Sequence, residues 1–489
     1  MATTASVPSS PRKQISLLGA VSILIGFVVG ASIFVLVGPL AGQVGPGLPL
    51  AYILACVPAV FACLYNIQLA GALPTTGANY VAGTRFISPS AGFVTTWMIL
   101  VGACFGVPLL AVGFASYLAE LVPGTPITLA AVAVVVLLGG VNLLGLRVAA
   151  VVQAIMVALF LLALGIYIVG GIPQVDAARY SPLLPNGTSA LLLAAIAAYY
   201  SFTGFTVITE VAGEVRDARR NVPRAIIISF LVVLAIYVGV TGVLTGTMDW
   251  QTAGESPAAV ADSAATYLPD GVVTFISLGA LFASATTINA VFTSLSRDIL
   301  QLGRDGVFPT WFGRSREKSG SPYGGILTLT AVSVVGVLLA FGIERYALIT
   351  VFAFLVIHLI TATAVMRLPK QRPDLWEMSP FKFTPFWRWF SYLGMVILAL
   401  LIFGYASYDD PVSGLVFLLC SAIAVPYWMI RRRILLKRGI DLNHSMRRFT
   451  DEMSTELDLP GEAAGGPGAG TEASTRTQSS AASRARPLE

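Results

Sequence analysis

Long apolar runs separated by short charged segments dominate the chain. No charged residue occurs between Lys13 and Arg85, and ten further charge-free runs follow, each long enough for one membrane span. A helix needs about 20 apolar residues to cross the hydrocarbon core of a bilayer. The first run is long enough for two spans, because Gly45, Pro46 and Gly47 favour a turn in its middle. The pattern therefore predicts an all-α integral membrane protein with twelve transmembrane helices.

The same pattern divides the chain into five parts. We expect a cytoplasmic N-terminal tail, two groups of five helices, a pair formed by helices 11 and 12, and a cytoplasmic C-terminal tail, over residues 1–14, 15–170, 190–367, 389–430 and 431–489. The stretch 461–489 is rich in Gly, Ala, Ser and Thr. Such a composition cannot bury enough apolar surface to fold, so most of this tail is expected to be disordered.

The distribution of Lys and Arg predicts the orientation. If the N-terminus is cytoplasmic, the outer loops hold only Arg179 and Arg345 of the 30 basic residues, and they carry acids such as Asp176, Asp249 and Glu255. Cytoplasmic loops of membrane proteins are enriched in Lys and Arg. We therefore expect a multi-pass protein of the cell membrane with both termini in the cytoplasm. Its net charge of +5 then reflects this membrane topology, and no nucleic acid is needed to explain it. Membrane lipid is an expected partner.

Composition narrows the classes of function. The chain is 56% hydrophobic and 11% charged, against about 25% charged in soluble domains. It has only two His and four Cys, the latter all in apolar runs, so neither a metal cluster nor a disulfide framework is expected. No catalytic constellation and no ring of like charges is evident. An enzyme, a cofactor and a channel are therefore not expected, which leaves a transporter or a membrane sensor.

Two spans contain residues that disfavour a continuous helix. The first span carries Gly26, Gly30 and Ser32, and the sixth span carries the run 201–206, Ser-Phe-Thr-Gly-Phe-Thr. Where a helix unwinds in a membrane, its freed N–H and C=O groups need polar partners. In transporters, substrate and coupling ion fill this role between half-helices. The alternative is that small residues only allow close helix packing.

The positions of the two segments favour the binding site. They begin the two groups of five helices, and an odd number of spans makes the second group enter from the opposite side. Freed N–H groups suit a carboxylate and freed carbonyls suit an ammonium. The site therefore predicts an amino acid substrate. The predicted substrate-binding residues are Val29, Gly30, Ala31, Ser32, Phe202, Thr203, Gly204 and Thr206.

Four segments resemble signatures of the amino acid–polyamine–organocation (APC) superfamily, the amino acid permeases with the LeuT fold. They are residues 30–34, 74–80, 202–225 and 296–309, which include Gly-Ala-Ser-Ile-Phe in the first span and Asn-Val-Pro-Arg-Ala after the sixth. The resemblance covers roughly residues 15–430. It implies a five-plus-five inverted repeat with helices 1 and 6 unwound, two added C-terminal helices, and secondary active transport by alternating access.

The resemblance also suggests a coupling ion. Many proton-coupled or exchanging relatives carry a lysine in span 5, where this chain has Phe160. Span 8 reads Ala-Ser-Ala-Thr-Thr over residues 283–287, which is similar to the sodium site of LeuT-fold symporters. This implies Na⁺ symport. The alternative is that Thr286 and Thr287 only donate hydrogen bonds to their own helix. The implied Na⁺ ligands are Gly26, Val29, Ala283, Thr286 and Thr287.

Other readings stay open. Glu210 is an acid near the end of a span and could bind a proton or act in gating, or it could pair with a loop arginine. Relatives that exchange cationic amino acids often carry an acid where this chain has Thr206, which favours neutral substrates here. The alternatives are a proton-coupled symporter, an amino acid or polyamine exchanger, and a sensor. Either a monomer or a homo-oligomer fits the sequence.

Overall fold

The structure is a computed structural model. The residues it describes are 15–30, 32–75, 77–144, 146–210, 212, 215–304, 306–316, 321–437, 442–443 and 446. Within them, only the backbone is described for residues 146–154, 206, 207, 210, 301 and 304. The predicted N-terminal tail, and the C-terminal tail beyond residue 446, lie outside the described residues.

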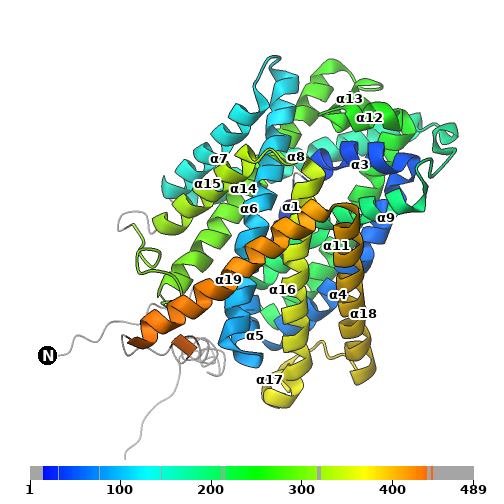
Figure 1. Ribbon diagram of the computed structural model, residues 1–489. Helices are drawn as coiled ribbons and strands as arrows, with labels where there is room; N and C mark the ends of the chain where they lie inside the picture. Colours follow the sequence, from blue (N-terminus) through cyan, green and yellow to red (C-terminus); the bar gives the residue numbers. More distant parts are fainter. Residues whose placement is uncertain are drawn as a thin grey trace, which may run out of the picture.

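Long apolar helices make up nearly all of the described chain (Figure 1). Eleven helical segments are long and apolar enough to cross a membrane: Leu17–Val35, Val37–Ala72, Pro89–Leu121, Ile127–Leu144, Ile155–Gln174, Gly187–Phe205, Ala218–Thr247, Asp270–Leu300, Ile343–Gln371, Pro385–Asp409 and Pro411–Lys437. The remaining predicted span corresponds to α15 (Tyr323–Leu338), which has 16 residues. At 1.5 Å per residue α15 is about 24 Å long, somewhat short of a 30 Å hydrocarbon core.

Individual helices subdivide these segments or lie in the connections between them. The long ones are α1 (Leu17–Val29), α4 (Leu48–Ala72), α6 (Pro89–Leu121), α7 (Ile127–Leu144), α8 (Leu146–Gly171), α9 (Gly187–Ala198), α11 (Ala218–Thr247), α14 (Asp270–Arg304), α16 (Ile343–Gln371), α18 (Pro385–Asp409) and α19 (Pro411–Lys437). The shorter ones are α2 (Ser32–Val35), α3 (Val37–Val44), η1 (Gly45–Gly47), α5 (Ala78–Phe86), η2 (Ile172–Gln174), η3 (Ala177–Tyr180), η4 (Tyr199–Thr206), α10 (Val207–Glu210), α12 (Trp250–Glu255), α13 (Ala259–Ala265) and α17 (Pro373–Met378). The predicted turn in the first apolar run is the 3₁₀ turn η1, where Gly45 has φ 80°.

Helix α6 forms the centre of the bundle, and it contacts α16, α14, α7 and α15 (Figure 1). Small residues allow these helices to approach closely. A Cβ on Gly336 of α15 would lie 2.6 Å from the carbonyl oxygen of Cys104 in α6. Helix packing in membranes depends on such close approach, because lipid supplies no hydrophobic driving force. Gly336 therefore lets α15 approach α6 closely.

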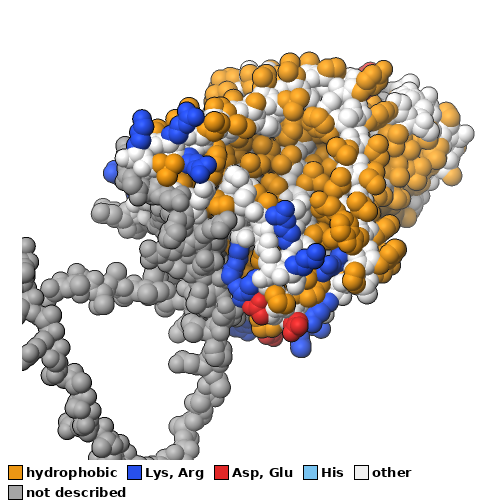
Figure 2. Space-filling view, turned by 60° about the horizontal axis from the view of Figure 1, so that its bottom comes forward, with side chains coloured by type: hydrophobic (Ala, Val, Ile, Leu, Met, Phe, Trp, Pro, Cys, Tyr) orange, Lys and Arg blue, Asp and Glu red, His pale blue; other side chains and the backbone are white. Residues whose placement is uncertain are grey.

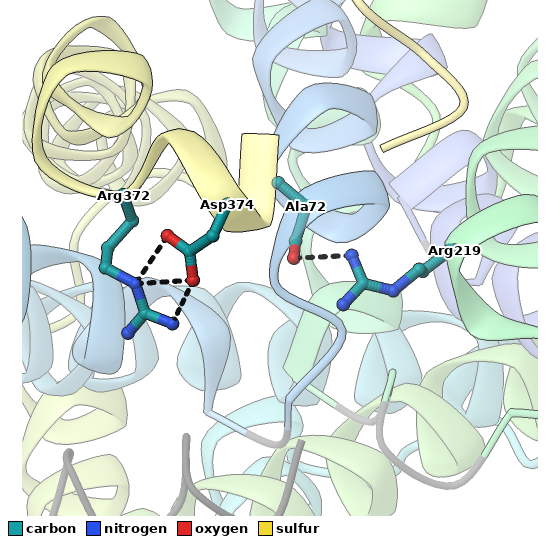
Figure 3. A network of polar contacts seen from close by, with 4 residues as sticks. All are labelled: Ala72, Arg219, Arg372 and Asp374. Carbon is teal, nitrogen blue, oxygen red and sulfur yellow. Dashed lines mark hydrogen bonds and ion pairs between the residues drawn. The ribbon is translucent and has the colours of Figure 1, made fainter. Parts of the chain in front are cut away.

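One end of the bundle, here named the basic end, gathers Lys and Arg side chains (Figure 2). Hydrogen bonds tie its segments together. The Arg216 amide donates to the Ile15 carbonyl at 2.9 Å, and Arg367 donates to the Phe86 carbonyl at 3.3 Å. The Arg219 guanidinium donates to the Ala72 carbonyl at 2.9 Å, at the C-terminus of α4 (Figure 3). A cation at that end of a helix also interacts favourably with the helix dipole.

The other end, here named the acidic end, holds the predicted outer loops. The Arg345 guanidinium at the start of α16 donates to both carboxylate oxygens of Asp410, at 2.8 and 3.2 Å. The Ser413 hydroxyl donates to the same carboxylate at 2.6 Å. Burial alone would raise the pKa of Asp410, but the Arg345 and Ser413 hydrogen bonds hold this pKa below its ordinary value. This ion pair connects α16 to the turn between α18 and α19.

Candidate functional site

The first span is divided between two helices, α1 and α2. Helix α1 ends at Val29, and Gly30 follows with φ 33° and ψ −145°. A Cβ at Gly30 would lie 2.3 Å from Oγ1 of Thr287 in α14. Only glycine suits this position, because the positive φ disfavours other residues and no room exists for a side chain. Helicity resumes at Ser32, whose hydroxyl donates to the Val29 carbonyl at 3.4 Å.

The sixth span changes its helix type over the predicted residues. Helix α9 ends at Ala198, and η4 then runs as a 3₁₀ helix from Tyr199 to Thr206 before α10 begins. Such a long 3₁₀ stretch is uncommon and often marks a functional or strained segment. Gly204 packs here against the end of α1. A Cβ on Gly204 would lie 2.9 Å from Cδ1 of Phe27 and 3.2 Å from Cα of Val28.

Tyr237 of α11 joins the two spans at these points. Its hydroxyl lies 2.7 Å from the carbonyl oxygen of Val28 and 2.9 Å from that of Ser201. Both carbonyls are therefore within reach of one donor, in a region where the regular α-helical pattern ends. The side chain is completely buried. The ring of Phe202 packs edge-on against the Tyr237 ring, with 5.1 Å between the ring centroids. Sequence reasoning missed Tyr237, because nothing in its local pattern distinguishes it from a packing tyrosine.

A cavity of about 130 Å³ lies beside both segments. At about 10–15 Å³ per water position, it has room for on the order of ten waters or a solute of similar size. Its walls come from α1, α2, α5, α6, η4, α14 and α16. The lining residues are Phe27, Val28, Gly30, Ser32, Asn79, Ile99, Gly102, Ala103, Gly106, Val107, Leu110, Tyr200, Ser201, Thr203, Gly204, Thr287, Val291, Ser294, Leu295, Asp298, Thr350, Phe354 and Ile357.

Several residues predicted from sequence meet at this cavity. Gly30, Ser32, Thr203, Gly204 and Thr287 all line it. Other predicted residues have different places. Val29 and Phe202 are buried but do not line the cavity. The backbones of Thr206 and Glu210 belong to η4 and α10, but their side chains lie outside the described residues, as does all of Ala31.

The cavity also has walls that sequence reasoning missed. On α6, Gly102, Ala103 and Gly106 face the cavity and leave space opposite Phe354 of α16. A run of small residues at helical spacing inside a span was the available signal. Asp298 of α14 is the one charged side chain among the described residues that line the cavity.

The residues implied as Na⁺ ligands have well-defined partners. The hydroxyls of Thr286 and Thr287 both donate to the Ala283 carbonyl, each at 2.9 Å. This is the ordinary bond of a helical threonine to its own helix. Only Thr287 lines the cavity, where it lies against Gly30. Gly26 faces α8 instead, with a Cβ position 2.8 Å from the Val157 side chain.

Comparison with known proteins identifies the family of the chain. The family model described as amino acid permease matches residues 15–425. The chain belongs to this family. It is therefore a membrane transporter and not an enzyme, which confirms the resemblance drawn from the motifs.

The relatives of this permease that are named for a substrate are named for different ones. It is 30% identical over 362 residues to an uncharacterized protein of Methanocaldococcus jannaschii, covering 71% of this chain and 81% of that protein. It is 25% identical over 374 residues to a branched-chain amino acid permease of Bacillus subtilis, covering 72% and 80%. A methylthioribose transporter of Bacillus subtilis is 23% identical over 384 residues, covering 74% and 82%. Family membership thus establishes transport and does not fix the substrate.

Proposed function

We propose that this permease is a secondary active transporter of neutral amino acids that couples their movement to Na⁺ by alternating access. The observation that carries the proposal is the cavity between Gly30 and η4, where two helices lose their regular pattern side by side. A zwitterion complements such a place. Its carboxylate accepts hydrogen bonds from freed N–H groups, and its ammonium donates to freed carbonyls.

The wall opposite these segments favours an apolar side chain. Ile99, Leu110, Phe354 and Ile357 line it, together with the small residues of α6. A mostly apolar pocket with few polar groups selects ligands by shape and by burial of apolar surface. The branched-chain amino acid permease of Bacillus subtilis is a relative that is named for substrates of this kind. The proposed substrate is therefore a neutral amino acid with an apolar side chain.

A cationic substrate is the second candidate, and Asp298 favours it. This carboxylate lines the cavity, and a side-chain cation could interact with it. A chloroplastic cationic amino acid transporter of Arabidopsis thaliana is 27% identical over 325 residues, covering 62% of this chain and 57% of that protein. Competition of labelled leucine uptake by unlabelled lysine separates the two candidates, since only the second predicts strong inhibition.

The proposed Na⁺ site uses Thr286 and Thr287 with carbonyls of Gly26, Val29 and Ala283. A hydroxyl that donates to Ala283 keeps lone pairs that can coordinate a cation. Hard oxygen ligands suit Na⁺, and the absence of a lysine at Phe160 leaves no competing ammonium. The side chain of Phe160 is fully buried, in α8. Proton coupling through Glu210 is the alternative.

The proposed architecture is an inverted repeat of residues 15–170 and 190–367, with the basic end in the cytoplasm. The clustering of Lys and Arg at one end supports this orientation (Figure 2). A cysteine placed at Glu255, in α12, tests it. We expect membrane-impermeant maleimide to label this cysteine from outside intact cells. Labelling from the cytoplasmic side alone would overturn the orientation.

Uptake into proteoliposomes tests the coupling. We expect uptake of a neutral amino acid to need Na⁺ and to fail in choline. Thr286→Ala and Thr287→Ala should each raise the Na⁺ concentration for half-maximal uptake, and the double variant should raise it further. Thr328→Ala is the matched control, because its hydroxyl also bonds its own helix, to Gly324 at 2.9 Å in α15, away from the cavity. Uptake that ignores Na⁺, follows pH and is lost in Glu210→Gln would support proton coupling instead.

A further inference from the structure

A second, much smaller cavity lies between α4, α16 and α18. Its volume is about 10 Å³, which is close to the space of a single water molecule. Its polar lining includes Tyr65 and Gln68 of α4 and Arg388 of α18. It shares no lining residue with the central cavity. It is therefore a separate site.

Three residues that line this cavity each carry a buried polar atom without a hydrogen-bond partner in the described part of the chain. These atoms are the Tyr65 hydroxyl, Oε1 of Gln68 and Nε of Arg388. The side-chain amide nitrogen of Gln68 donates a hydrogen bond to the Leu64 carbonyl at 3.1 Å, and its Oε1 atom remains without a donor. The guanidinium of Arg388 lies over the ring of Trp376 at 5.3 Å. A buried polar group without a partner costs free energy, so native proteins rarely contain three of them together.

The chemistry of the three atoms is complementary to water. Nε of Arg388 can only donate, Oε1 of Gln68 can only accept, and the Tyr65 hydroxyl can do either. One water molecule can accept from Arg388, donate to Gln68 and use its remaining hydrogen or lone pair on Tyr65. A buried water typically makes about three hydrogen bonds. An anion fits less well, because Oε1 of Gln68 would repel it.

From the volume and these three unpaired atoms, we propose that the cavity is a binding site for one ordered water molecule, which links α4 to α18. Tyr65 extends this link toward the wall of the central cavity. Its ring lies 6.2 Å from the ring of His358, which in turn lies 6.3 Å from Phe354, a lining residue of that cavity. The water thus supports the packing behind the transport site.

An experimental map that resolves ordered water tests the proposal directly. We expect density within about 2.7–3.2 Å of all three atoms. An empty cavity, or side chains that shift to bond one another, would overturn it. Density that disappears when chloride is replaced by gluconate would identify an anion and would also overturn it.

Melting temperatures of the purified full-length protein give an independent test, which does not depend on what the permease transports. Gln68→Leu and Tyr65→Phe should each lower the melting temperature by several degrees. The double variant should fall by less than the sum, because either change alone already releases the water. Fully additive shifts would contradict a shared water. Ser391→Ala is the matched control, since Ser391 lines the same cavity but its hydroxyl bonds the Arg388 carbonyl at 3.0 Å.

Discussion

Replacing Gly204 by alanine tests whether the contact between η4 and α1 shapes the proposed substrate site. The added methyl would lie 2.9 Å from Phe27 and 3.2 Å from the backbone of Val28. Carbon atoms pack at about 3.5–4.0 Å, so η4 must move away by roughly 0.5 Å or more. Because a backbone atom is involved, rotation of one side chain cannot relieve the clash. Overpacking of this kind costs about 1–3 kcal/mol.

We expect the substrate to bind only when η4 has its wild-type position against α1. In the variant, binding must therefore pay the overpacking energy, and the affinity falls. A cost of about 1–3 kcal/mol corresponds to a Kd that is about 5- to 150-fold weaker. Scintillation proximity binding to the purified permease measures this change without transport. The substrate is the labelled amino acid that the wild type takes up best.

Gly165→Ala in α8 is the matched control. No atom lies within 4 Å of its Cβ position, so alanine should leave binding unchanged and even favour the helix by up to about 1 kcal/mol. Wild-type affinity in Gly204→Ala would refute the reasoning and place the substrate away from η4. An equal loss of affinity in Gly165→Ala would show that the assay reports general damage to the fold.

Two further changes probe the contacts that hold the helices together. Tyr237→Phe removes the hydroxyl that reaches the Val28 and Ser201 carbonyls. The change should cost about 1–3 kcal/mol of stability and weaken substrate binding. An unchanged melting temperature and unchanged affinity would argue against a role of the hydroxyl in joining the two spans. Asp410→Asn should cost at most about 1 kcal/mol at neutral pH, because Arg345 is partly exposed. Since the pKa of Asp410 is depressed in the folded protein, its contribution is present above its ordinary pKa of about 3.9 and is lost as pH falls below that value. The difference in melting temperature between Asp410→Asn and wild type should therefore shrink toward pH 3, and a constant difference would contradict the assignment.

The spans were readable from the sequence because the bilayer imposes a simple rule on it. Apolar runs of sufficient length predicted the helices, and charges marked their ends. One boundary shows the limit of this rule. The run between Lys318 and Glu344 looks long enough for a full span, yet α15 covers only Tyr323–Leu338. Hydropathy records which residues tolerate lipid, whereas the bounds of a helix also depend on its caps and neighbours.

Parts of the site were also visible as local chemistry. Gly30 and Gly204 stood out because glycine in a span disfavours a regular helix, and both line the cavity. Thr287 was identified through a resemblance, and its hydroxyl lies against Gly30. The two glycines could be found because each violates a local expectation for a membrane helix.

Only the tertiary structure brought in the remaining groups. Tyr237 reaches across from α11 to two carbonyls, 209 and 36 residues away in the sequence. Tyr65, Gln68 and Arg388 enclose one small cavity from two helices that are more than 300 residues apart in the sequence. The chain by itself determined which segments enter the membrane, because burial in lipid depends on each segment's own composition. The fold decided which polar atoms meet inside it, because that depends on how helices pack, and packing is a property of pairs of segments.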